Sequence, residues 1–333
     1  MFCLDVLRLN YFLEKLIFIL TFAYIGGTIR VQLRERGYTL ISTLIGVFIM
    51  TKFDHRRKYY MVLDCETATL PCAHAYEGDA RQAVAIAKPL IYDLGWQVID
   101  RQGRVYSRKH FLISEIFSVP AIFNTAYYAS KRPQYIEMLN KREIILTDWA
   151  TASAEMLADM VHCTAVGAYN SMFDFKKAIP FTELYINKLY SNDFYTWEKE
   201  QNRYCERIAH GGNKGNSKEF EADVFRFRGN VFPLFDLWGM SCEHLLNNDD
   251  YKRMCVDENW TTASGKYFKT SAETAYRFLT GDMEFDEAHT ALDDAIIESE
   301  LFAAIVKPNL RNLTIGITYF PFRLLGLVDN FNY

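Results

Sequence analysis

The segment Tyr59-Tyr60-Met61-Val62-Leu63-Asp64-Cys65-Glu66-Thr67 predicts a buried β-strand that ends in two carboxylates. Residues two apart in a strand point to the same side, so Asp64 and Glu66 are expected to face one site. Carboxylates held this close repel each other unless a cation lies between them, and oxygen ligands of this kind suit Mg²⁺ or Mn²⁺. A solvated strand end would have the same Asp-x-Glu pattern, so this segment alone does not establish a metal site.

A second segment, Ala168-Tyr169-Asn170-Ser171-Met172-Phe173-Asp174, places a third carboxylate where a short strand is expected to give way to a helix. The positive end of a helix dipole stabilises a carboxylate or a ligand. Asn170 lies four residues before Asp174, where it could fix the turn or contact a substrate. Taken alone, Asp174 is equally compatible with an ordinary helix cap.

A third segment, Glu287-Ala288-His289-Thr290-Ala291-Leu292-Asp293-Asp294, leads from a polar loop into an apolar helix. On one helix His289 and Asp294 would lie roughly 140° apart, at ~100° per residue. This offset favours His289 on the incoming loop and Asp294 one turn into the helix, with Asp293 pointing elsewhere. Together the three segments indicate a chain that holds divalent metal ions beside a base.

The composition limits the class of protein. The chain has 333 residues, of which 50% are hydrophobic and 15% aromatic, so wholesale disorder is excluded. The net charge of −4 gives no signature of a generic nucleic-acid coat. Seven scattered cysteines without a Cys-x-x-Cys pair argue against a disulfide framework and favour a reducing, cytoplasmic location. We favour buried or free thiols over the alternative of a zinc site, which would use Cys205, His210, Cys242, His244 and Cys255.

The chain is expected to have three parts. Residues 1–57 form an apolar extension, residues 58–307 the main domain, and residues 308–333 a tail that either packs against the body or is disordered. The apolar stretches 16–27 and 38–50 are shorter than the roughly 18–20 residues that a membrane span needs. The extension is either a membrane hairpin or signal anchor, or a dispensable addition that plays no part in the fold, such as sequence upstream of a start at Met50. We favour the dispensable addition.

Within the main domain the pattern predicts an α/β fold with a mixed β-sheet covered by helices. Residues 191–231 are polar, charged and aromatic, and are expected to form a surface insertion. Strands are expected at 59–64, 84–99, 105–113 and 164–169, with a turn at 100–104. Helices are expected at 151–162 (capped by Thr151 or Ser153), 173–190, 233–246, 249–259, 271–279 and 290–306.

The three segments together resemble the DnaQ-like 3′–5′ exonucleases of the DEDDh type, which include proofreading subunits of bacterial replicative polymerases and phage-type exonucleases. Asp64-Cys65-Glu66-Thr67 matches the family's Asp-x-Glu-Thr motif, Asn170 to Asp174 its Asn-x-x-Phe-Asp motif, and His289 to Asp294 its His-x-Ala-x-x-Asp motif. Asp236-Leu237-Trp238 resembles the Asp-Thr-Leu element between the last two motifs. Thr69 and Tyr169 replace a frequent glycine and a frequent histidine, which bears on substrate preference.

The resemblance implies a ribonuclease H-like fold and two Mg²⁺ or Mn²⁺ ions that hydrolyse the terminal phosphodiester at a nucleic-acid 3′ end. Asp64 would bridge the ions, Glu66 and Asp294 would complete one site, Asp174 would serve the second, and His289 would be the general base. The substrate-binding candidates are Thr67, Leu70, Asn170 and Phe173.

The sequence is compatible with three functions. The first is a DNA 3′–5′ exonuclease in proofreading, repair or phage-type replication, with a polymerase partner implied by the family alone. The second is an exoribonuclease of the ribonuclease T or oligoribonuclease type. The third is an inactive nucleic-acid-binding or membrane-attached adaptor, which the intact set of carboxylates and histidine argues against.

Overall fold

The computed structural model describes residues 53–54, 56–70, 88–197, 200, 221–308 and 313–331, and the backbone of three N-terminal strands. The chain divides into two compact units, Met1–Asp54 and His55–Tyr333. The first unit contains an antiparallel sheet of the order β1-β2-β3, formed by β1 (Phe22–Ile25), β2 (Thr28–Glu35) and β3 (Tyr38–Ser42). The predicted boundary at residue 57 therefore lies close to the observed one.

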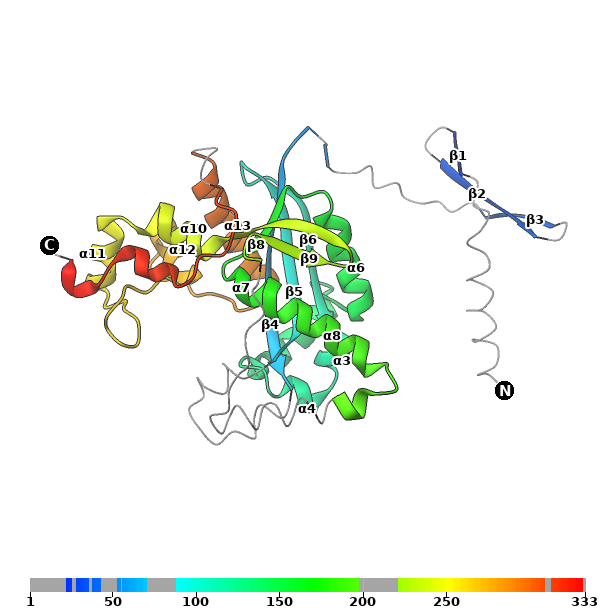
Figure 1. Ribbon diagram of the computed structural model, residues 1–333, viewed down its shortest axis with the longest axis horizontal. Coiled ribbons are helices and arrows are strands. Elements are labelled where there is room, and N and C mark those ends of the chain that lie inside the picture. The colour runs from blue at the N-terminus through cyan, green and yellow to red at the C-terminus, as the bar shows by residue number, and fades with distance from the viewer. Residues whose placement is uncertain are drawn as a thin grey trace. The chain divides into compact units, whose positions relative to one another are not determined.

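The second unit is built on a mixed sheet of seven strands with the order β7-β6-β5-β4-β8-β10-β9 (Figure 1). Strands β4, β5 and β6 form an antiparallel meander, and β8 and β10 continue the sheet parallel to β4. The two edge strands differ, because β7 pairs parallel with β6 and β9 antiparallel with β10. The strands are β4 (Tyr59–Thr69), β5 (Pro89–Asp100), β6 (Val105–Ile113), β7 (Ile145–Thr147), β8 (Ala165–Ala168), β9 (Val224–Phe227) and β10 (Asn230–Asp236).

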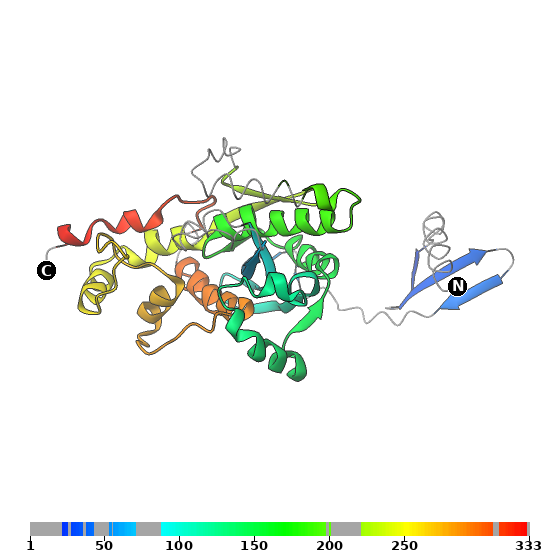
Figure 2. The same cartoon turned by 90° about the horizontal axis from the view of Figure 1, so that it is seen from below.

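Helices cover both faces of this sheet, and every residue of the central strand β5 is buried. Side chains alternate between the two faces of a strand. On one face Asp93 and Gly95 contact the start of α13, and on the other Trp96 donates a 2.9 Å hydrogen bond to Asp159 of α6. Figure 2 shows the helices on either side of the central strands. The α-helices are α3 (Ser114–Phe117), α4 (Pro120–Phe123), α5 (Arg132–Lys141), α6 (Trp149–Met160), α7 (Ser171–Phe173), α8 (Ile179–Leu189), α10 (Leu237–Ser241), α11 (Asp249–Asp257), α12 (Ala272–Thr280) and α13 (Ala291–Val306).

Gly95 allows α13 to approach the sheet. It pairs with Asp64 across the β4–β5 ladder. A Cβ atom at Gly95 would lie 2.3 Å from the backbone nitrogen of Leu292 and 2.5 Å from the carbonyl carbon of Ala291. The first turn of α13 can therefore lie against Asp64 only because this position has no side chain.

We expect Gly95→Ala to destabilise the protein by about 1–3 kcal/mol or more and to displace the start of α13, because backbone atoms cannot yield as a flexible side chain can. Chemical denaturation measures the loss. Gly265→Ala is the control, since its Cβ would meet no atom within 4 Å and only the penalty of its φ of +70° remains. Equal losses in the two variants would contradict this account of α13.

Most predicted elements are confirmed within a few residues, and three are corrected. The predicted insertion 191–231 is partly wrong, because Val224–Phe227 and the start of β10 belong to the main sheet. The predicted helix 233–246 begins at Leu237, since the preceding residues complete the buried strand β10. The N-cap of α6 is Asp148, which accepts a 2.7 Å hydrogen bond from the Thr151 backbone N–H, in place of Thr151 or Ser153.

The described part of the tail, residues 313–331, packs on the second unit. Gly316 forms a parallel bridge with Phe235 of β10, and its N–H donates to the Leu234 carbonyl at 2.7 Å. Phe322 stacks on Trp238 of α10 and meets Tyr267 edge-on. Packing against the body is thus confirmed for these residues. Within the described ranges, none of the helices has the length and apolarity required to cross a membrane.

Candidate metal and catalytic site

Strand β4 presents Asp64 and Glu66 on the face of the sheet that α13 covers. Asp64 pairs with Gly95 and Glu66 with Asp93, both of which contact α13. The register shifts between Glu66 and Thr67, so the regular ladder is interrupted directly after the motif. Such irregularities re-aim side chains beside functional sites. The two carboxylates share one side, as predicted.

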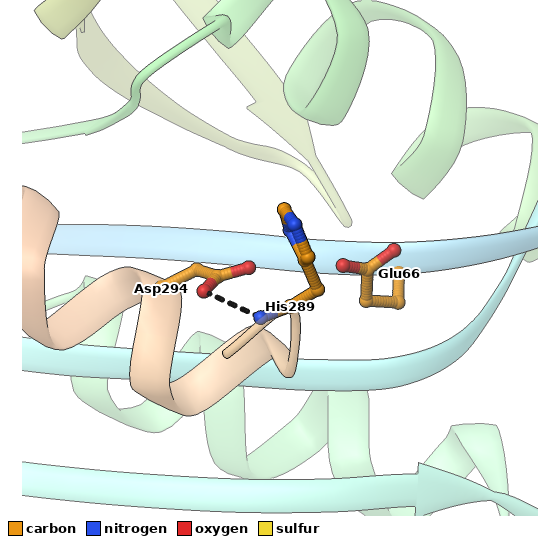
Figure 3. Close-up of side chains that lie close together, drawn as sticks. All are labelled: Glu66, His289 and Asp294. Carbon is orange, nitrogen blue, oxygen red and sulfur yellow. Dashed lines mark hydrogen bonds between the residues drawn. The ribbon is translucent and has the colours of Figure 1, made fainter. Parts of the chain in front are cut away.

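The loop before α13 brings His289 and Asp294 to the same place. One ligand atom from each of Glu66, His289 and Asp294 lies within 4.8 Å of the others, and Figure 3 shows these side chains gathered between β4 and α13. The His289 backbone N–H donates a 3.2 Å hydrogen bond to Asp294 Oδ1. His289 has a φ of 49°, the left-handed conformation that lets the chain turn into the helix. His289 on the loop and Asp294 in the helix are confirmed.

Tyr128 and Lys131 define the surroundings of the His289 ring. The Tyr128 ring stacks on it with centroids 4.6 Å apart and an interplanar angle of 17°. The Lys131 ammonium lies over the same Tyr128 ring, 4.9 Å from its centroid, and donates to the Ala288 carbonyl. Burial and the Lys131 charge lower the pKa of His289 below its ordinary value, against opposing effects of Asp286 and Glu273. The imidazole is therefore neutral near pH 7 and able to accept a proton.

Asp174 lies at the start of a π-helical segment, Asp174–Ala178, between α7 and α8. Asp174 is the C-cap residue of α7 but the N-cap of no helix, and its Oδ1 accepts a 2.9 Å hydrogen bond from the Cys65 thiol. Burial raises the pKa of Asp174 to about 7, although the Cys65 hydrogen bond opposes the rise. The side chain of Asp174 therefore does not serve as an N-terminal helix cap. Single π turns of this kind are frequent at functional sites.

The site concentrates negative charge. Burial, followed by the charges of Glu298, Asp174, Asp294 and Glu66, raises the pKa of Asp64 well above its ordinary value. Burial and then Asp93 raise the pKa of Glu66 to about 8, with Lys131 opposing, and burial and then Glu287 raise that of Asp294 to about 9. All these carboxyls hold protons more tightly because ionising them together is unfavourable without a compensating cation.

This donor set fits a hard divalent cation. Carboxylate oxygens from β4 and α13 converge, and Mg²⁺ and Mn²⁺ prefer such ligands. Asp64 and Asp174 belong to the same charged cluster but lie outside the three-residue group, so the described residues form one candidate metal position.

The alternative zinc set gains no support among the described residues. Cys242 and Cys255 are buried free thiols, and neither they nor His244 form a ligand group there. Cys205 and His210 lie outside the described residues.

The substrate-binding candidates lie in different environments. Thr67 and Phe173 are half-buried and Asn170 is exposed at the start of α7, where its carbonyl accepts a 2.7 Å hydrogen bond from Phe173. Leu70 is buried, with 2% of its surface exposed. Contact of these four residues with a nucleotide stays a prediction.

Sequence reasoning missed three residues that shape the site: Asp93, Glu298 and Tyr128. Asp93 is fully buried and receives hydrogen bonds from Tyr135 at 2.8 Å and from the Ala291 backbone N–H at 3.0 Å, which anchors the start of α13. Glu298 accepts a 3.2 Å hydrogen bond from the Tyr169 backbone N–H, and its position four residues after Asp294 places both on one helix face. An acidic residue inside the apolar run 90–96 could have indicated Asp93, whereas no sequence signal indicates Tyr128.

The raised pKa values predict that the metal-free protein loses stability as the pH rises. In the unfolded chain these carboxyls ionise near pH 4, whereas Glu66 and Asp294 in the fold have pKa values of about 8 and about 9. The folded state thus binds more protons between these limits, and the free energy of unfolding falls by on the order of a few kcal/mol from about pH 5 to about pH 9. Urea unfolding in EDTA measures this slope. Saturating Mg²⁺ should flatten it, and an identical slope with and without Mg²⁺ would contradict the prediction.

Comparison of the chain with protein-family models, with curated proteins and with solved structures finds no match. The interpretation of the site therefore depends on its own residues and geometry.

Proposed function

We propose that this chain is a metal-dependent 3′–5′ exonuclease of ribonuclease H-like fold that hydrolyses the terminal phosphodiester of single-stranded or frayed DNA ends. The observation that carries the proposal is the convergence of Glu66, His289 and Asp294, from segments more than two hundred residues apart, beside Asp64 and Asp174. An antiparallel meander that β8 and β10 extend in parallel is the arrangement expected for such a sheet.

In this proposal the carboxylates of Asp64, Glu66 and Asp294 would hold one Mg²⁺ or Mn²⁺ ion, and those of Asp64 and Asp174 would hold a second. When bound, the ions supply activation of the attacking water and stabilisation of the leaving 3′ oxygen. The neutral His289 ring takes the proton from that water as the new O–P bond forms. The bond from phosphorus to the 3′ oxygen of the preceding nucleotide breaks, and a nucleoside 5′-monophosphate leaves.

Aromatic residues at the site support a single-stranded substrate. Tyr128 stacks on His289, and the adjacent Tyr127 is 88% exposed and meets Tyr128 edge-on with centroids 4.8 Å apart. Exposed aromatic rings bind unpaired bases by stacking, at roughly 1–3 kcal/mol per base. A base in a duplex presents no such face, so unpaired ends should be preferred.

A nuclease assay tests the function. The full chain is incubated with single-stranded DNA labelled at the 5′ or the 3′ end, in Mg²⁺, Mn²⁺ or EDTA. We expect a progressive ladder from the 5′-labelled strand and immediate release of mononucleotide from the 3′-labelled one, with no reaction in EDTA. Matched RNA oligomers decide between deoxyribonuclease and exoribonuclease. Products that are the same for the wild type and Asp64→Ala, or no shortening at all, would overturn the proposal.

A further inference from the structure

A basic pocket lies at the end of the sheet where β4 begins. It is a cavity of about 510 Å³ between the start of β4 and the turn that joins β5 to β6. We call this cavity the hairpin pocket. Its lining combines four cationic side chains with one carboxylate and one amide: Arg57, Lys58, Arg101, Arg104, Asp100 and Gln102. A chain with a net charge of −4 thus gathers positive charge here.

The single carboxylate of the hairpin pocket is engaged in the turn. Asp100 is only 4% exposed, and its Oδ1 accepts hydrogen bonds from the backbone N–H groups of Gln102 at 2.9 Å and Arg104 at 3.1 Å. Its Oδ2 accepts from the Tyr106 hydroxyl at 3.0 Å. Asp100 therefore fixes the backbone that carries Arg101 and Arg104, and most of its own capacity to accept hydrogen bonds is used.

Two of the cations are available to a ligand. Lys58 and Arg104 are exposed, and neither side chain has an ion-pair partner within the described ranges. Arg101 contacts the carbonyl of Val306 at 3.1 Å, which ties the turn to the end of α13. A second cavity borders Gln102 and is lined by two cationic side chains and one carboxylate: Arg108, Lys307 and Glu300. Positive charge therefore continues beyond one pocket.

We propose that the hairpin pocket binds backbone phosphates of a single-stranded nucleic acid whose 3′ end lies at the catalytic site. This inference rests on the proposed function. Lys58 precedes Asp64 by six residues, or about 20 Å along an extended strand. An extended single strand covers about twice the ~3.4 Å per nucleotide of a stacked duplex strand, so about three nucleotides span this distance. A dinucleotide therefore cannot reach the pocket from the catalytic site, whereas longer strands can.

Fluorescence anisotropy of 5′-labelled oligodeoxynucleotides tests the proposal, with Ca²⁺ in place of Mg²⁺ to measure binding without turnover. The test protein is the full chain carrying Lys58→Gln and Arg104→Gln. The loss of two phosphate contacts should weaken binding of a strand of about 12 nucleotides about 25-fold at about 0.1 M salt and reduce the slope of log K against log salt by about 1.4. Binding of a dinucleotide should not change.

The matched control removes two exposed cations elsewhere, by Lys141→Gln and Arg253→Gln, which lie on α5 and α11. An effect of equal size in this control, or less than twofold weakening in the test variant, would overturn the proposal. Vesicles of phosphatidylserine and phosphatidylcholine form a second arm. If the test variant loses binding to vesicles but keeps its affinity for oligonucleotides, the pocket binds lipid headgroups, and the proposal is overturned as well.

Binding and hydrolysis separate this inference from the proposed function. Length-dependent weakening in the test variant, with a wild type that shortens no strand, would support the hairpin pocket and reject the exonuclease. If the wild type shortens strands and the test variant binds them normally, the exonuclease is supported and the hairpin pocket is rejected as a phosphate site.

Discussion

Asp64→Asn should abolish 3′–5′ hydrolysis, with a loss of at least about a thousandfold, or about 4 kcal/mol of transition-state stabilisation. The substitution keeps the volume of the side chain and removes a carboxylate oxygen from the predicted metal ligands. Asp64 is surrounded by Glu298, Asp174, Asp294 and Glu66, whose charges raise its pKa. The variant should therefore unfold at a higher urea concentration than the wild type in EDTA, because its neutral amide can be buried among these carboxyls without taking up a proton.

In Mg²⁺ the wild type should be more stable than Asp64→Asn, which reverses the order expected in EDTA. Bound metal stabilises the wild type by mass action, and the variant should lose most of that gain. Asp293→Asn is the control, because Asp293 is exposed and accepts a hydrogen bond from Thr290 Oγ1, away from the site. It should keep both activity and the effect of Mg²⁺. A variant at Asp64 that is less stable than the wild type in EDTA would show that this carboxylate has a structural role that we do not assign to it.

The sequence predicted the site better than its surroundings, for a physical reason. The shared side of Asp64 and Glu66 was predicted from the alternation of side chains in a strand, and the position of Asp294 from its spacing to a loop histidine. Local geometry is sufficient for both predictions. Asp93 and Tyr128 act through tertiary packing. Asp93 meets Ala291 across about two hundred residues of chain, and no local pattern reports that contact.

The errors in the fold have the same origin. Pro233 and the residues after it have the apolar content of either a helix or a buried strand, and pairing of β10 with β8 decides for the strand. Val224–Phe227 lies in a region of polar composition, yet its pairing with β10 makes it the edge of the main sheet. Short apolar runs are ambiguous by themselves, so partners elsewhere in the chain determine the outcome.

His289→Gln should lower kcat about a hundredfold to ten-thousandfold, because the attacking water loses its proton acceptor. KM should change little if the residue acts on the water and not on the strand. In the wild type, burial and Lys131 lower the pKa of His289, so kcat should rise with pH to a plateau, with a midpoint below the ordinary pKa of histidine. The variant should lack this acidic limb. Steady-state rates across this pH range measure both effects.

The same variant decides whether His289 is a base or a metal ligand, since its ring lies within 4.8 Å of the carboxylates of Glu66 and Asp294. A base can be removed without loss of metal affinity, so the rise in melting temperature caused by Mn²⁺ should equal that of the wild type. Removal of a metal ligand lowers the affinity for the metal. If His289 is a ligand, the increase in melting temperature caused by Mn²⁺ should therefore be smaller in the variant, as is expected for Asp64→Asn. His162→Gln, at an exposed histidine after α6, controls for the loss of an imidazole elsewhere. Tyr128 stacks on the face of the ring and leaves its in-plane nitrogens for the water or for a metal, so the effect of Mn²⁺ on the variant decides between the two roles.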